Sequence, residues 1–440
     1  MTGLSKMAQA DGPGHAPARR ARAESGHTHM NVTPPGPAPW RAIAAGASAS
    51  FVGIGLARFA YTPLLPELIN AHWFSPSAVA YLGAANLAGY LLGALAARRV
   101  ARRLGDRRAL RWMMVLATVG LLACSVPVSV VWFFGWRLVS GVAGGVIMVR
   151  VAGAVLPHLR GERRGLAGGA IFAGLGLGIA ASGTLVPLLL TAGLSSTWFG
   201  LAALCALLTA LSWSGWPTPR AAAVSGAPSR AGESARSPRM TLLLVQYALI
   251  SMGLVPAMSF LADFVSRGLG RGSGSGSMVW IVYGLGALVG PTLYGLLGDR
   301  LGFARALLLI TLVQTGALTA LAFAHGLPEV AVLSAVIGSF PPGVVPVVLG
   351  RVHELVPARV EEQSAAWGRA TVAGALSLAV SAYLYSYVFD LTGQNHRVLF
   401  LIGGGALVLA LLTGLAARFV RSGGERAVHV VAPEPVTTAG

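Results

Sequence analysis

Twelve apolar stretches, each long enough to cross a lipid bilayer, run through this 440-residue chain and constrain its fold more than any other feature. A membrane-spanning helix needs about 20 mostly apolar residues. Hydrophobic residues make up 55% of the chain and charged residues 11%, whereas soluble domains carry about 25% charged residues. The stretches predict twelve transmembrane helices, at residues 41–66, 77–97, 109–127, 131–156, 166–190, 197–215, 241–264, 278–298, 304–323, 329–350, 366–389 and 398–417.

The second six stretches repeat the first six at an offset of about 200 residues. The segment at 93–98 returns at 295–300, and the pair Ala173-Gly174 returns at 373–374. Secondary transporters are commonly built from such repeats, whose two halves rock around a site near the bilayer midplane. We therefore expect an all-α integral membrane protein with two pseudo-symmetric six-helix bundles.

Polar segments delimit these bundles. Residues 1–38 lack an apolar run and are expected to form a disordered cytoplasmic tail. Residues 217–239 form a Pro/Ser/Arg-rich cytoplasmic linker, and residues 421–440 form a second polar tail. The two predicted bundles then comprise residues 39–216 and 240–420.

The net charge of +18 comes from basic residues that are concentrated in the connectors of one side of the predicted membrane helices. Basic residues cluster at 98–111, 160–164, 220–239 and 418–426, which belong to one set of alternating connectors and the C-terminal end. The opposite connectors hold only three arginines, namely Arg267, Arg271 and Arg397. Positively charged loops face the cytoplasm, so we expect both termini there. An anionic-lipid or nucleic-acid patch is the alternative reading of this charge; we expect no nucleic-acid partner.

The sequence predicts neither a cofactor nor an enzymatic activity. A Walker A loop needs a lysine beside the phosphates, and Lys6, in the N-terminal tail, is the only lysine. Cys124 and Cys205 lie alone in apolar stretches, without metal-ligand spacing. His353 and Glu354 are adjacent and do not form a zinc-binding H-E-x-x-H pattern.

The connector after the eighth stretch reads Gly295-x-x-x-Asp299-Arg300-x-Gly302 and resembles the signature loop of the major facilitator superfamily. Glycine permits close helix contact, and Asp299 can accept hydrogen bonds from a helix N-terminus or an arginine across the cytoplasmic seam. The first-half copy has Ala97 where the acid belongs. We therefore predict a one-sided conformational latch in the second half.

The fourth stretch resembles the same superfamily through Arg137-x-x-x-Gly141-x-x-Gly144-Gly145. Segments 55–66, 81–93 and 280–286 are more specifically similar to its YbfB/YjiJ-type branch. The resemblance covers about residues 41–420 and implies a transporter with the major facilitator fold. It implies no particular ligand.

Arg58 is the most informative charged residue inside an apolar stretch. A central arginine costs about 2.5–3.5 kcal/mol on insertion scales, so it should face the bundle interior or a watery cavity. Tyr61 follows one turn later, and prolines at 63, 66 and 256 suggest matching helix irregularities around a central site. Arg58 is thus a candidate substrate ligand; the alternatives are a structural ion pair or a hydrogen bond to a neighbouring helix.

Two further arginines share the fourth stretch, about 140° apart on its helical wheel. Arg137 belongs to the family motif, and its candidate roles are structural support, proton coupling or substrate contact. Arg150 and its counterpart Arg351 lie near inner helix ends, where long side chains reach the interface. Their candidate roles are interfacial anchoring or a cytoplasmic gate with Glu354 and Glu162.

Polar residues in other stretches complete the candidate site. Asn86 and Tyr90 share one helix face at i, i+4 and could line the cavity with Tyr283. Glu67 and Asp263 lie near outer helix ends, where we expect water to reach them. Either acid is a candidate for proton coupling, with no measurable role as the alternative.

The embedded charge favours one class of cargo. Arg58 and Arg137 have no equally deep acidic residue in the sequence, and a guanidinium binds carboxylates through two parallel hydrogen bonds. We predict a monomeric, multi-pass transporter of the bacterial plasma membrane that moves a small organic anion, a carboxylate or aromatic acid, by proton symport. The alternatives are proton-driven efflux of a drug or amphipathic metabolite, and a membrane sensor without transport activity.

Overall fold

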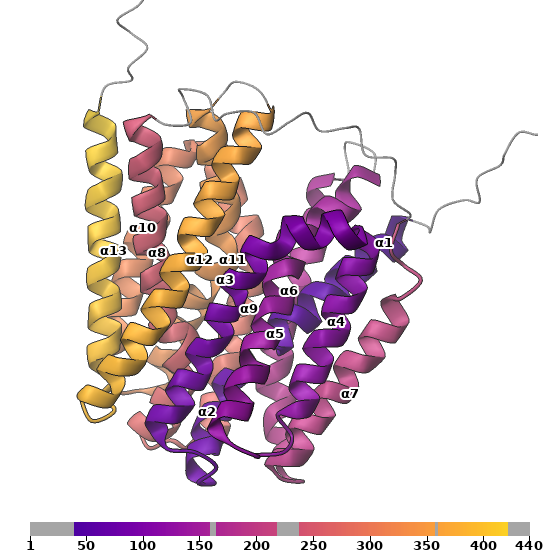
Figure 1. Ribbon diagram of the computed structural model, residues 1–440. Coiled ribbons are helices and arrows are strands. Elements are labelled where there is room, and N and C mark those ends of the chain that lie inside the picture. Colours follow the sequence, from indigo (N-terminus) through magenta and orange to yellow (C-terminus); the bar gives the residue numbers. More distant parts are fainter. Residues whose placement is uncertain (1–38, 159–163, 218–236, 357–359, 421–440) are drawn as a thin grey trace, which may run out of the picture. The chain divides into compact units, whose positions relative to one another are not determined.

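The computed structural model describes residues 39–158, 164–217, 237–356 and 360–420 (Figure 1). Within these ranges the chain is helical apart from short connections. The predictions for both tails, most of the linker and Glu162 lie outside the described residues. The helices belong to one compact unit, Gly36–Gly440.

Each predicted apolar stretch corresponds to helical structure. The helices of the first half are α1 Pro39–Ser50, α2 Tyr61–Asn70, α3 Pro76–Leu104, α4 Asp106–Ala123, α5 Val130–Val155, α6 Arg164–Leu190 and α7 Leu194–Ser212. Those of the second half are α8 Pro238–Asp263, α9 Gly272–Leu301, α10 Phe303–Phe323, α11 Leu327–Leu355, α12 Val360–Leu391 and α13 His396–Phe419. Several helices run well past their predicted ends because charged residues such as those at 98–104 continue the helix beyond its apolar part.

Eleven helical segments in the described part of the chain are long and apolar enough to cross a membrane. The first of them, Trp40–Asn70, combines α1 and α2. Helix α4 is not among the eleven, since Asp106, Arg107, Arg108 and Arg111 all lie in its first two turns. Helix length and apolarity therefore support a membrane protein, and α4 is the helix with the highest fraction of charged residues in the described part of the chain.

Glycine turns join equivalent helices in the two halves. Gly105 connects α3 to α4 with a φ of 74°, and Gly302 connects α9 to α10 with a φ of 79°. Such positive φ angles are strained for residues with a side chain. Gly193 and Gly393, before α7 and α13, also have positive φ. The repeat seen in the sequence thus extends to the backbone conformation of its turns.

The first predicted helix is broken just before the prolines at 63 and 66 that predicted an irregularity in it. A π-helical turn at Phe51–Leu56 is followed by an irregular turn at residues 57–60, and α2 then begins at Tyr61. The glycines of this turn allow very close packing, because a Cβ on Gly55 would overlap the backbone of Gly178 in α6. The break separates Arg58 and its neighbours from regular helix geometry.

The prediction of matching irregularities in the two halves is wrong. Pro66 lies inside α2 and Pro256 inside a continuous α8. The π-helical turn of the second half, Phe264–Gly268, follows α8 at its far end, well beyond Pro256. Proline alone therefore does not locate the break; the close glycine packing of the first half accompanies it.

The two halves contact each other through three principal helix pairs, α3 with α12, α6 with α9, and α2 with α8. Figure 1 shows α3 and α12 side by side although they are far apart in the sequence. Small residues permit the α6–α9 contact, since a Cβ on Gly176 or Gly284 would overlap the facing backbone. The α2–α8 contact brings the break of the first half against the C-terminal part of α8.

Candidate functional site

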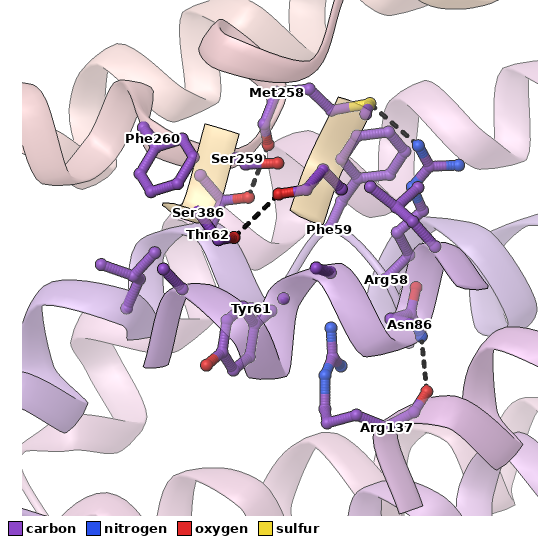
Figure 2. A pocket seen from close by; sticks show the side chains of 16 residues that line it. Arg58, Phe59, Tyr61, Thr62, Asn86, Arg137, Met258, Ser259, Phe260 and Ser386 are labelled. Carbon is purple, nitrogen blue, oxygen red and sulfur yellow. Dashed lines mark hydrogen bonds between the residues drawn. The ribbon is translucent and has the colours of Figure 1, made fainter. Parts of the chain in front are cut away.

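A small cavity lies where the break after residue 56 meets α3, α5, α8 and α12 (Figure 2). Its volume of about 30 Å³ has room for about two water molecules. Its walls are aromatic and aliphatic, with a few polar groups: Arg58, Phe59, Tyr61, Thr62, Leu65, Ala80, Gly83, Ala84, Asn86, Leu87, Arg137, Met258, Ser259, Phe260, Ala382 and Ser386. The cavity therefore has to enlarge before it can admit an organic molecule.

Arg58 is partly buried and lies in the irregular turn itself. Its Nη2 donates to the sulfur of Met258 at 3.0 Å. The guanidinium carbon lies 5.1 Å from the ring centre of Phe59 and 5.3 Å from that of Tyr90. Among the described residues Arg58 forms no ion pair, so the predicted alternative of a hydrogen bond to another helix describes this structure, with a weak sulfur acceptor.

Arg137 is buried on the other side of α2 from Arg58 (Figure 2). Its Nη1 donates to the carbonyl of Ala57 at 2.7 Å, and its guanidinium lies over the ring of Tyr61 at 4.3 Å. The Tyr61 hydroxyl in turn donates to the carbonyl of Val79 at 2.7 Å. These contacts tie α5 and α3 to the irregular turn, so Arg137 and Tyr61 support the geometry around Arg58.

Asn86 and Tyr283 are also buried close to this centre. The Asn86 amide nitrogen donates to the carbonyl of Arg137 at 3.1 Å. Tyr283 stacks on Trp280 with 4.6 Å between ring centroids. The Oδ1 atom of Asn86 and the hydroxyl of Tyr283 have no hydrogen-bond partner within the described structure. Tyr90 contacts Arg58 without forming part of the cavity wall.

Sequence reasoning missed the second-half side of the cavity. Met258, Ser259 and Phe260 come from α8, and Ser386 comes from α12. Neither methionine nor phenylalanine is distinctive in an apolar helix. The only available signal was the position of these residues just after Pro256.

The C-terminal parts of α5 and α11 carry ion pairs that differ in part from the predicted ones. Arg150 binds both carboxylate oxygens of Asp106, at 2.7 and 2.8 Å, and does not pair with Glu354. Arg351 pairs with Glu354 at 2.7 Å. Asp106 is the first residue of α4, and sequence reasoning overlooked this acid.

The signature loop does not form the contacts expected of it in this conformation. Asp299 and Arg300 are exposed and bond to no other described residue. Glu354 accepts the backbone N–H of Phe303 at 3.0 Å, so it caps the N-terminus of α10 in place of Asp299. A Cβ on Gly295 would meet no atom within 4 Å, and the expected close helix contact is absent at this position.

The expectation that water surrounds Asp263 is wrong. Its side chain is fully buried and bonds to Arg267 at 2.5 and 2.6 Å. The Nε2 atom of His396, the first residue of α13, lies 2.6 Å from the same carboxylate. Arg267 also donates to Gln394 at 2.8 Å. Folding brings α13 over the end of α8 and encloses this acid. Glu67, by contrast, is partly exposed and borders an open depression with Trp73.

Comparisons with known proteins identify the class of fold. Residues 50–415 match the family described as "Uncharacterised MFS-type transporter YbfB". A crystal structure of a D-xylose–proton symporter is similar with a TM-score of 0.66 and 14% identity, over 86% of this chain and 96% of that one. A mutant of the nucleoside transporter NupG is similar with a TM-score of 0.68 and 14% identity, over 86% and 99% of the two chains. The search of curated proteins gave no match.

Proposed function

The chain belongs to the YbfB-type family of MFS transporters, and from this premise we propose that it carries a small organic monocarboxylate across the bacterial plasma membrane. The single observation that carries the proposal is the guanidinium of Arg58, which borders the central cavity with only a thioether as hydrogen-bond acceptor. A guanidinium offers five N–H donors in a planar fork. A carboxylate satisfies two of them at once with charge-assisted bonds.

The cavity walls favour an anion with an apolar body. Phe59, Leu65 and Phe260 contribute apolar surface next to Arg58. Arg137 already donates to a backbone carbonyl and lies over Tyr61, which leaves one guanidinium for one carboxylate. An aromatic or branched aliphatic monocarboxylate fits this arrangement better than a dicarboxylate.

Within this proposal the protein has twelve spans in two six-helix bundles, with α4 as the twelfth. Its charged first turns lie at the cytoplasmic interface, where Arg111 donates to the carbonyl of Trp213 at the end of α7. Tryptophan and arginine are both favoured at that interface. Both termini are then cytoplasmic, and the ion pairs of Arg150 and Arg351 lie at the inner ends of their helices.

Protons are the proposed driving ion. Glu67 is the more accessible of the two candidate acids, because Asp263 is enclosed by Arg267 and His396. An inward proton gradient across proteoliposomes should accelerate uptake of radiolabelled benzoate, and Glu67→Gln should reduce this acceleration. Equal uptake with and without the gradient would remove proton coupling from the proposal.

The signature loop is proposed to act in a conformation in which the inner ends approach each other. Because Asp299 is exposed and unbonded here, Asp299→Asn should leave the melting temperature unchanged while slowing transport. An unchanged transport rate would show that Asp299 takes no part in the conformational cycle.

The central test compares benzoate with benzamide, which has a similar shape and no charge. Purified protein at a benzoate concentration of 100 times the dissociation constant should gain about 2.7 kcal/mol of stability, and benzamide should add little. Arg58→Lys should lose most of this gain, because an ammonium keeps the charge without the planar fork. Stabilisation by the cationic dye ethidium alone would favour efflux of amphipathic cations, and full benzoate binding by Arg58→Ala would exclude Arg58 as the ligand.

A further inference from the structure

Met258 is bonded to the other half of the molecule through both its side chain and its backbone. Its sulfur accepts from Arg58 Nη2 at 3.0 Å, and its carbonyl accepts from the Thr62 hydroxyl at 2.8 Å. The residue is only 4% exposed and lies five residues before the C-terminal end of α8, Asp263. Figure 2 shows its side chain extending over the cavity wall to the guanidinium of Arg58.

We propose that Met258 is an internal plug, whose thioether occupies in the ligand-free protein the position at Arg58 that the substrate carboxylate occupies in the loaded protein. This inference rests on the proposed role of Arg58 as the carboxylate ligand. It adds a specificity-determining residue from the second half to a site that otherwise depends on the first half.

The chemistry of the two acceptors favours an exchange. A thioether is a weak acceptor, and it leaves most N–H groups of Arg58 without a partner among the described residues. A carboxylate forms shorter bonds that are roughly twice as strong as those between neutral groups. The substrate carboxylate therefore competes with a thioether that is easily displaced. A carboxylate side chain of the protein in the same place would not be easily displaced.

The side chain of methionine can leave without movement of α8. It is unbranched and has three rotatable bonds, and the bond between Thr62 and the Met258 carbonyl does not depend on the side-chain rotamer. Because the cavity of about 30 Å³ is too small for an organic anion, rotation of Met258 would provide space next to Arg58. The same rotation frees the guanidinium and enlarges its cavity.

The exchange also alters the connection between the halves. Arg58 belongs to the first half and Met258 to the second, so displacement of the sulfur removes one direct hydrogen bond between them. The substrate then bridges Arg58 to the cavity-lining residues of α8 and α12, which include Ser259 and Ser386. Substrate binding at the Arg58 guanidinium is thereby linked to the contact between the two halves, which changes during the proposed alternating-access cycle.

Three substitutions test the plug by isothermal titration with benzoate. Met258→Leu keeps the approximate volume and removes the acceptor, and it should tighten benzoate binding about three-fold, the equivalent of one weak hydrogen bond. Met258→Glu places a tethered carboxylate at Arg58 and should weaken benzoate binding at least about 100-fold. Met258→Gln has the same shape as glutamate without its charge and should weaken binding far less. Met252→Leu, elsewhere on α8, is the matched control and should bind benzoate as the wild type does.

The outcomes separate the plug from the proposed function. Equal benzoate affinity in the wild type, Met258→Leu and Met258→Glu would overturn the plug and leave Arg58 as the ligand. Weaker binding by Met258→Leu would overturn the plug as well. If the wild type shows no Arg58-dependent binding of benzoate or of another monocarboxylate, the proposed function fails and the plug fails with it. Should Met258→Glu not fold, the opposite changes expected of the Leu and Gln variants decide the question.

Discussion

A guanidinium inside a membrane protein is best understood from the groups that accept its hydrogen bonds. Arg137 donates to a backbone carbonyl of the irregular turn and covers an aromatic ring. Arg58, one residue after that carbonyl, donates to sulfur. The first arginine therefore supports the turn, and the second has a weaker acceptor and, in the proposed function, N–H groups for a ligand. The two residues lie close together and have different consequences for stability and binding.

Arg137→Leu should destabilise the protein even when no ligand is present. The substitution removes the donor to the Ala57 carbonyl and the contact with Tyr61, and a lost hydrogen bond to a charged group costs about 1.5–3 kcal/mol. Thermal unfolding in detergent would measure the loss. Arg58→Ala is the control, and it should melt at or above the wild-type temperature because no acid is left unpaired. Wild-type melting of Arg137→Leu would contradict the supporting role.

Asp263→Asn should be among the most destabilising substitutions outside the cavity. The carboxylate is fully buried between Arg267 and His396, and removal of one member of a buried pair costs about 3–5 kcal/mol. Arg267 is 20% exposed, which places the expected cost at the lower end of that range. Asp390→Asn, an exposed acid at the end of α12, should change the unfolding free energy by less than about 0.5 kcal/mol. Similar melting of the two variants would refute a structural role for Asp263.

At the scale of helices, one packing arrangement occurs in both halves. Helices α3 and α5 form the most extensive contact of the first half, and α9 and α11 that of the second. Each contact is a seam of glycines whose missing side chains let the backbones approach. A Cβ would overlap the facing backbone at Gly89, Gly93, Gly141 and Gly145 in the first half and at Gly286, Gly290 and Gly338 in the second. Van der Waals contact between small residues is a principal source of helix association in membranes.

Gly141→Ala should separate α3 from α5. The new methyl group would overlap the carbonyl of Asn86, and overpacking costs about 1–3 kcal/mol. Gly135→Ala on the same helix is a close control, since a Cβ there meets no atom within 4 Å. Unfolding measured on both variants should show a loss only for Gly141→Ala. A loss of equal size at Gly135 would contradict overlap at the seam as the cause, because alanine in open space should if anything stabilise the helix.

At the scale of the whole molecule, the distribution of charge predicts the orientation, and small residues permit the close α6–α9 contact between the halves. Most arginines lie at one end of the helices, which the positive-inside rule assigns to the cytoplasm. The contact of α2 with α8 holds the cavity closed around Arg58 and Met258. Transport in the proposed cycle requires these contacts to separate and re-form without a change in the packing inside each half.

The proposed orientation can be tested by cysteine labelling in intact cells. The native Cys124 and Cys205 are buried and can be replaced by alanine. A cysteine in place of the exposed Ser195, the second residue of α7, should react with an impermeant maleimide from outside. A cysteine in place of the exposed Arg103, at the end of α3, should react only after the membrane is opened. The reverse pattern of labelling would invert the topology.

The sequence alone predicted the helices, the repeat and the family, and the match over residues 50–415 confirms the family. These features are determined locally: apolar length, glycine spacing and short motifs do not depend on what packs against them. The presence of Arg58 and Arg137 inside apolar stretches followed from the same reasoning.

The choice of partners was decided only by the tertiary structure. Asp263 is enclosed by a histidine 133 residues later, and Arg150 is paired with an acid 44 residues earlier. Met258 has no feature in the sequence that distinguishes it from a core methionine, and the break before Tyr61 lies beside the close approach of α6 to Gly55. Hydrogen bonds and ion pairs act over a few ångströms, so they are fixed by which distant segments meet. The sequence determined that this chain places arginines inside apolar helices; the tertiary structure decided which acceptor each of them meets, a backbone carbonyl for Arg137 and a thioether for Arg58.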